Sequence, residues 1–193
     1  MKIGIMGGSF DPPHLGHMIL AQDAQDYFKL DKIIFVPVAE SPLKGRTPTA
    51  SGRLRLAMIE AAIAPRREWC VSDWELKQGG VSYSSHTALH LHRLYPDAEL
   101  HWIIGADQLA QLSAWYRIDD LCRLVRFVVA LRDGDMLVSP PKLNPCVVIE
   151  PLPARRLDIS STEIRECMKA VRPVDFFLPQ GVMQIIEHEN PYR

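Results

Sequence analysis

The chain has 193 residues, 47% of them hydrophobic, and its 22 Lys and Arg against 23 Asp and Glu give a formal charge of −1. This composition favours a globular protein with one substantial core, and it excludes the strong basic field that drives nonspecific nucleic-acid binding. The chain begins directly in a predicted strand, with neither a basic segment nor a long apolar run, so we expect no signal peptide, and no apolar run approaches the ~20 residues needed to cross a bilayer. We expect one cytoplasmic domain over residues 1–193, with neither nucleic acid nor a membrane as partner; whether it forms a homo-oligomer is left open.

Short apolar runs alternate with amphipathic stretches along the chain, as in a parallel sheet covered by helices. The predicted strands are Lys2–Met6, Lys32–Pro37, Trp69–Ser72, Leu100–Ile104, Arg126–Leu131 and Cys146–Ile149. Helical faces are predicted within Leu20–Phe28 and Leu56–Ile63, and whole helices at Ser84–Leu94, Ser161–Met168 and Gly181–His188. This order indicates an α/β fold with a doubly wound parallel sheet and a C-terminal helical cap over residues 158–193. Such sheets bind ligands at the carboxyl ends of their strands.

The four cysteines, Cys70, Cys122, Cys146 and Cys167, are widely scattered and form no Cys-x-x-Cys pair. Their spacing favours neither a zinc site nor a disulfide framework. We therefore expect four free thiols, as in a protein of the reducing cytosol.

Residues 7–17 read Gly-Gly-Ser-Phe-Asp-Pro-Pro-His-Leu-Gly-His and follow the first predicted strand directly. Gly7 and Gly8 let backbone N–H groups approach an anion, and the N-terminus of the next helix adds unpaired N–H groups and about half a positive charge. His14 and His17 are three residues apart, so on one helical turn they share a face and can converge on a phosphate. A Gly-Gly turn alone is common in α/β domains, but two histidines aimed at it indicate a triphosphate site.

This segment resembles the (T/H)xGH signature of the nucleotidyltransferase superfamily, with His-Leu-Gly-His at residues 14–17. More narrowly, residues 7–14 resemble the opening of bacterial nicotinate-nucleotide adenylyltransferases. The resemblance implies a Rossmann-like nucleotidyltransferase fold and catalytic roles for His14 and His17. It also implies ATP contacts at Gly7, Gly8, Ser9 and Phe10.

Lys44 lies in the loop after the second predicted strand, within Glu-Ser-Pro-Leu-Lys. A loop lysine is ordinarily solvated surface, but this one matches a family segment commonly read as PPHK, whose lysine reaches the phosphates. The resemblance therefore implies a catalytic role for Lys44. The chain departs from the family at Leu43, where the family commonly has His.

Gly105 ends the fourth predicted strand and permits close backbone approach. Asp107 is placed to accept from ribose hydroxyls, to hold a Mg²⁺ water, or only to cap a helix. Gly-x-Asp followed by a tryptophan, here Trp115, resembles the pyridine-nucleotide adenylyltransferase pattern, in which the indole stacks on the pyridine ring. By the same resemblance, Arg132 falls in the region that supplies an arginine on the adenosine side.

Ser82-Tyr83-Ser84 resembles the family's SYT stretch near the carboxylate of the acceptor, with Ser84 in place of the usual Thr. Backbone N–H groups and hydroxyls are good partners for a carboxylate. The resemblance therefore implies an acceptor site at Ser82, Tyr83, Ser84 and Trp115 with a preference for nicotinate over nicotinamide.

Residues 158–165 read Asp-Ile-Ser-Ser-Thr-Glu-Ile-Arg and open the predicted cap. Ser160 or Ser161 can cap a helix there, and Arg165 lies one turn in, facing the same end. Taken alone, this pattern is no more than a capping box, but it also resembles the ISSTxxR motif of the superfamily. The resemblance implies that this motif cradles the β and γ phosphates of ATP, with ATP contacts at Ile159, Ser160 and Ser161 and a catalytic role for Arg165.

Together the motifs favour transfer of AMP from ATP to nicotinate mononucleotide, with Mg²⁺ accompanying ATP and no metal site of the protein's own. The alternatives are a phosphopantetheine adenylyltransferase, which shares the first and last motifs, and a nucleotide-binding module without catalysis. A dehydrogenase is disfavoured, because Gly4, Gly7 and Gly8 do not form Gly-x-Gly-x-x-Gly.

Overall fold

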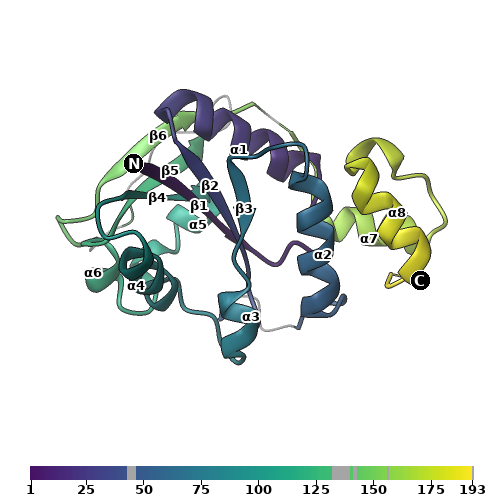
Figure 1. Ribbon diagram of the computed structural model, residues 1–193, viewed down its shortest axis with the longest axis horizontal. Coiled ribbons are helices and arrows are strands. Elements are labelled where there is room, and N and C mark those ends of the chain that lie inside the picture. Colours follow the sequence, from purple (N-terminus) through teal and green to yellow (C-terminus); the bar gives the residue numbers. More distant parts are fainter. Residues whose placement is uncertain (43–46, 132–139, 141–142, 156, 193) are drawn as a thin grey trace.

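The computed structural model describes residues 1–42, 47–131, 140, 143–155 and 157–192. Within them, six strands form one sheet in the order β3-β2-β1-β4-β5-β6, and all neighbours are parallel (Figure 1). The strands are β1 (Lys2–Gly8), β2 (Lys32–Pro37), β3 (Trp69–Val71), β4 (Glu99–Gly105), β5 (Val125–Leu131) and β6 (Ile149–Pro153). The doubly wound sheet is confirmed, and β1 to β5 lie where the apolar runs predict them.

Helices cover both faces of this sheet. They are α1 (Leu15–Phe28), α2 (Gly52–Ile63), α3 (Trp74–Gln78), α4 (Ser84–Leu94), α5 (Ala106–Leu109), α6 (Ile118–Leu121), α7 (Ser161–Lys169) and α8 (Gln180–Glu189), with short 3-10 turns η1 (Leu112–Ala114) and η2 (Asp175–Phe177). Side chains alternate along β2, so Ile33 and Phe35 pack with α1 and α2 while Ile34 and Val36 pack with α4. The sequence did not reveal α3, α5 or α6, which are too short to carry a helical period.

The direction of winding reverses at β1, which lies between β2 and β4. The chain leaves β1 through α1 toward β2, whereas it leaves β4 through α5 toward β5 (Figure 1). Connections that diverge in this way open a crevice at the carboxyl ends of the two strands. The fold therefore sets the residues after Gly8 opposite those after Gly105.

The sixth strand differs from the prediction at Cys146–Ile149, because β6 begins only at Ile149. The residues before it form a turn, in which the Asn144 side chain accepts from the Cys146 N–H at 2.9 Å. β6 instead includes Pro151 and Pro153, and it is the edge of the described sheet. An edge strand tolerates proline because one of its sides needs no N–H donor.

The cysteines also differ from the prediction. Cys122 and Cys146 form a disulfide with Cα atoms 6.0 Å apart, while Cys70 and Cys167 are free. The prediction of four free thiols is therefore wrong for this pair. The two cysteines precede β5 and β6, which are parallel neighbours, so the sheet brings together residues that no spacing motif connects.

The C-terminal helices α7 and α8 pack beside α2 at one end of the molecule (Figure 1). Ile164 and Val182 are buried there against Met58 in a cluster separate from the two faces of the sheet. The predicted helical cap is thereby confirmed. Among the described residues, no helix is long and apolar enough to span a membrane.

Candidate active site

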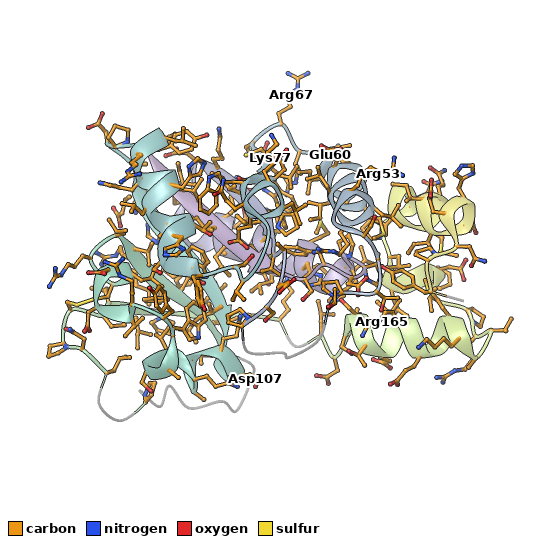
Figure 2. The ribbon with its side chains drawn as sticks, turned by 90° about the horizontal axis from the view of Figure 1, so that it is seen from below. Arg53, Glu60, Arg67, Lys77, Asp107 and Arg165 are labelled. Atoms are coloured by element: carbon orange, nitrogen blue, oxygen red, sulfur yellow. A yellow bond between two sulfur atoms is a disulfide. The ribbon has the colours of Figure 1, made fainter. Side chains whose placement is uncertain are left out.

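A cavity of about 560 Å³ opens at the carboxyl ends of β1 and β4. Figure 2 shows Asp107 on α5 and Arg165 on α7, two of the side chains that line it. The predicted site residues on this first cavity are Gly7, Gly8, Ser9, Phe10, His14, His17, Gly105, Asp107, Ile159, Ser160, Ser161 and Arg165. Lys44 and Arg132 lie outside the described residues. The crevice of the sheet thus gathers motifs from opposite ends of the chain.

The two histidines stack against each other at the start of α1. His14 is the N-cap and His17 the third helical residue, and their ring centroids are 3.7 Å apart. The His14 backbone N–H donates to Nδ1 of His17 at 3.1 Å, so a neutral His17 carries its proton on Nε2. The pair shares one face of the first turn, as its three-residue spacing predicts.

His14 is buried beside the cavity that it lines. Burial lowers the pKa of its imidazole to about 4, so the ring is neutral at pH 7. Its Nδ1 is buried and has no hydrogen-bond partner within the described part of the chain. Gly16 provides the space for this ring, because a Cβ atom there would lie 3.0 Å from Nδ1 of His14.

The turn from β1 to α1 has an uncommon backbone conformation. Phe10 has a φ of 47°, in the left-handed region that residues other than glycine rarely adopt. Its buried ring packs against Phe35 and His17, with centroids 5.9 and 4.9 Å away. The buried Arg55 guanidinium, whose pKa desolvation lowers, donates to the Ser9 carbonyl at 2.8 Å. Packing and this bond together hold the turn against the cost of its conformation.

Helix α7 directs its N-terminus at the same cavity. Ser160 is its N-cap, with Oγ accepting a first-turn N–H at 3.1 Å. The Ser161 hydroxyl donates to the Pro12 carbonyl at 2.9 Å, and Arg165 donates to the Asp11 carbonyl at 2.7 Å. These bonds join the C-terminal motif to the first motif, so two helix N-termini, two imidazoles and a guanidinium surround one space. Such a set can bind a polyphosphate and neutralise its charge.

Sequence reasoning missed Asp11 as a site residue. Its carboxylate, 3% exposed, accepts from the N–H groups of Thr49 and Ala50 at 2.7 and 3.0 Å and from the Tyr192 hydroxyl at 2.9 Å. Nη1 of Arg165 lies 3.8 Å from Asp11 Oδ2. The position of Asp11 inside the first motif was the one available signal, because its carboxylate partners Ala50 and Tyr192 are 39 and 181 residues away.

A second cavity, of about 280 Å³, adjoins the first. The predicted acceptor residues Ser82, Tyr83, Ser84 and Trp115 all line it, and both cavities share Gly7, Gly8, Ser9, Ser41 and Gln108. Trp115 is half-buried and meets Phe127 edge-on, with centroids 6.2 Å apart, while the Tyr83 ring lies 4.4 Å from that of Tyr116. Aromatic rings therefore line this cavity together with the N-terminus of α4, which begins at Ser84.

Glu75 lies on the wall of the second cavity and is 5% exposed. Burial raises the pKa of this carboxyl, although the Thr87 hydroxyl donates to its Oε1 and opposes the shift. Ser82 accepts the Ala39 N–H at 2.9 Å beside it. Sequence reasoning missed Glu75, because nothing in the sequence distinguishes a buried carboxyl in a short helix from a solvated one.

A third cavity, of about 270 Å³, is also lined by His14 and His17. Leu20, Leu157 and Ile159 give it apolar walls, and Gly105 and Asp107 line it as well as the first cavity. In the part of the chain that the structure describes, no three His, Cys, Asp or Glu side chains gather as a metal site.

Known proteins resemble this chain in sequence and in fold. A family model described as cytidylyltransferase-like matches residues 5–167. The chain is 42% identical to the probable nicotinate-nucleotide adenylyltransferase of Methylacidiphilum infernorum, over 99% of this chain and 92% of that one. It is 40% identical to the protein of the same name from Opitutus terrae, over 100% and 98%. Its fold resembles that of the Plasmodium falciparum nicotinic acid mononucleotide adenylyltransferase complexed with NaAD, with a TM-score of 0.77, 18% identity and coverage of 99% and 97%.

Proposed function

The chain belongs to the cytidylyltransferase-like family, and from this premise we propose that it is a nicotinate-nucleotide adenylyltransferase of NAD biosynthesis. It transfers AMP from ATP to nicotinate mononucleotide and releases deamido-NAD and pyrophosphate. The observation that carries the proposal is that two cavities meet at Gly7 and Gly8, one edged by N–H donors and a guanidinium, the other by aromatic rings. Phosphates suit the first cavity and a pyridine ring suits the second.

The histidines act at the α-phosphate in this proposal. The 5′-phosphate of the acceptor is already an anion at pH 7, so the reaction needs no general base. One of its oxygens attacks the α-phosphorus while the bond to the bridging oxygen of pyrophosphate breaks. N–H groups of His14 and His17 bind the α-phosphate oxygens and stabilise the charge that develops there, so catalysis consists of positioning and neutralisation.

The leaving group occupies the end of the first cavity beside α7. Arg165 and the helix N-terminus at Ser160 and Ser161 bind the β and γ phosphates. Lys44 adds a further positive charge from its loop. Mg²⁺ enters as part of the MgATP substrate, bound to phosphate oxygens and water.

The adenosine moiety lies in the third cavity, whose apolar walls suit a base and whose Asp107 carboxylate can accept from the ribose hydroxyls. Gly105 has no side chain, and the position that a Cβ atom would take there is open, with nothing within 4 Å. The ligand can therefore approach the backbone of Gly105 closely. Ile159 contacts the base side, and Arg132 belongs to this end by resemblance.

The acceptor occupies the second cavity, with its pyridine ring stacked on Trp115. The hydroxyls of Ser82, Tyr83 and Ser84 and the N-terminus of α4 face its carboxylate, which favours nicotinate over nicotinamide. ATP, the donor, is a cytoplasmic metabolite, and we assign the enzyme to the cytoplasm.

The test is pyrophosphate release with MgATP and, at equal concentrations, nicotinate mononucleotide, nicotinamide mononucleotide or phosphopantetheine. We expect turnover that strongly favours the first acceptor. Turnover with phosphopantetheine alone would keep the triphosphate site and overturn the acceptor assignment. No turnover with any of the three would instead favour a nucleotide-binding module.

A further inference from the structure

Tyr192 is the last residue that the structure describes, and its side chain is 2% exposed. Its hydroxyl donates to Oδ1 of Asp11 at 2.9 Å, across 181 positions of the sequence. Burial, together with the neighbouring Asp11 carboxylate, raises the pKa of this phenol, so it remains a donor at neutral pH. A hydrogen bond from a buried hydroxyl to a carboxylate is stronger than one between neutral groups. Tyr192 is therefore attached firmly to the first motif.

Asp11 passes this restraint to two parts of the first cavity. Nη1 of Arg165 donates to the Asp11 carbonyl at 2.7 Å and lies 3.8 Å from its Oδ2. The N–H groups of Thr49 and Ala50 donate to the same carboxylate. Arg165 and Thr49 both line the cavity, so one carboxylate holds a cavity-lining guanidinium and a cavity-lining segment together.

The Asp11 carboxylate also interacts electrostatically with two cations. The guanidinium of Arg55, anchored on the carbonyls of Ser9 and Ala50 at 2.8 and 3.2 Å, interacts electrostatically with Asp11 as Arg165 does. An anion fixed beside two guanidinium groups offsets their mutual repulsion. The position of Arg165 therefore depends on how rigidly Asp11 is held.

We propose that Tyr192 is a positioning residue for the departing pyrophosphate, acting through Asp11 on Arg165 and on the segment at Thr49 and Ala50. The inference rests on the proposed function, because it takes the Arg165 end of the cavity as the end that binds the leaving group. The C-terminal cap is then part of the catalytic apparatus, since its Tyr192 side chain fixes the group that neutralises pyrophosphate.

The test is Tyr192→Phe, which removes the hydroxyl and keeps the buried ring. We expect kcat to fall about tenfold, and the affinity for inorganic pyrophosphate, measured by calorimetry, to fall by a similar factor, while KM for nicotinate mononucleotide stays unchanged. Asp11→Asn, which keeps the volume of the side chain and removes its charge, should show the same pattern more strongly.

Ile186→Val is the matched control, because Ile186 belongs to the same buried cluster as Tyr192. It should lower the Tm and leave the kinetic constants unchanged. If Tyr192→Phe behaves in the same way, Tyr192 is purely structural and the inference is overturned. An equal loss of affinity for pyrophosphate and for the acceptor would also overturn it.

The proposed function fails separately, if the wild-type chain releases no pyrophosphate from MgATP and nicotinate mononucleotide. In that case the calorimetric comparison still decides the inference. A roughly tenfold weaker binding of pyrophosphate by Tyr192→Phe supports the positioning role, and equal binding overturns it.

Discussion

The two regions that we propose to bind the phosphates and the acceptor are built in different ways. The first is buried and held by hydrogen bonds between distant segments: His14 and Asp11 are 6% and 3% exposed, and Asp11 and Pro12 accept bonds from residues 181 and 149 positions away. The second is partly open and aromatic, with Tyr116 49% exposed beside Trp115. Groups that neutralise developing charge need fixed positions, whereas a ring that recognises a planar acceptor mainly needs contact area. We therefore expect the phosphate-binding region, which we call the rigid region, to carry the chemistry, and the acceptor-binding region to select the acceptor.

The largest expected effect is a loss of turnover in the rigid region. His17→Ala removes the donor that we propose for the α-phosphate, and removing one preorganised donor raises a barrier by about 3 to 4 kcal/mol. We expect kcat to fall at least about a hundredfold, with a smaller change in KM for ATP, in a steady-state assay of pyrophosphate release. His188→Ala, at an exposed position on α8, is the control. A His17→Ala variant that keeps most of its turnover would remove His17 from the chemistry.

The second effect belongs to the acceptor region. Trp115→Ala removes the surface on which we propose that the pyridine ring stacks, and stacking of a base on an aromatic ring contributes about 1 to 3 kcal/mol. We expect KM for nicotinate mononucleotide to rise by about tenfold or more, with KM for ATP nearly unchanged. Trp74→Ala is matched to it, because Trp74 stacks on His90 and lines none of the three site cavities. Equal damage to both substrates would assign Trp115 a packing role and weaken the contrast between the regions.

The two regions also differ in how far the sequence predicts them. The positions of His14, His17 and Ser160 follow from local rules, because a strand end, a glycine turn and a helix cap are each decided within a few residues. The partners of Asp11 do not follow, since they depend on where the fold brings Ala50 and Tyr192. The same reason explains the missed pairing of Cys122 with Cys146.

Strand β6 shows the converse limit of a local rule. The apolar run at Cys146–Ile149 has the composition of a strand, but it is drawn partly into a turn by Asn144 and by the disulfide. The residues that pair with β5 include two prolines, which a strand rule rejects and an edge position tolerates. Tertiary context therefore decided the one strand that the sequence misplaced.

Buried His14 in the rigid region should also make the free energy of unfolding depend on pH. Because burial lowers the pKa of His14 from 6.5 to about 4, the native state binds fewer protons than the unfolded state between these values. This contribution is complete above pH 6.5 and is lost as the pH falls toward 4. We expect the wild type to lose about 1 to 2 kcal/mol more than His14→Gln between pH 7 and pH 5, measured by urea unfolding. An identical loss in both proteins would mean that His14 is protonated without cost. His188→Gln is the control, and it should lose as much stability between pH 7 and pH 5 as the wild type does.

The smallest effect has the opposite sign and belongs to the acceptor region. Because burial raises the pKa of Glu75, this carboxyl keeps its proton to a higher pH in the native state than in the unfolded state. Its contribution to stability is complete below the unfolded value of 4.5 and is lost as the pH rises through the folded value. The glutamine side chain of Glu75→Gln stays neutral and can still accept from Thr87. The free energy of unfolding of this variant, compared with that of the wild type, should therefore be higher at pH 8 than at pH 5. Glu60→Gln, on an exposed part of α2, is the control and should show no such gain (Figure 2). A gain for both variants would indicate a general charge effect. A loss for Glu75→Gln at pH 8 would show that the carboxylate is ionised and needed there, and the acceptor region would then carry a fixed charge like the phosphate region.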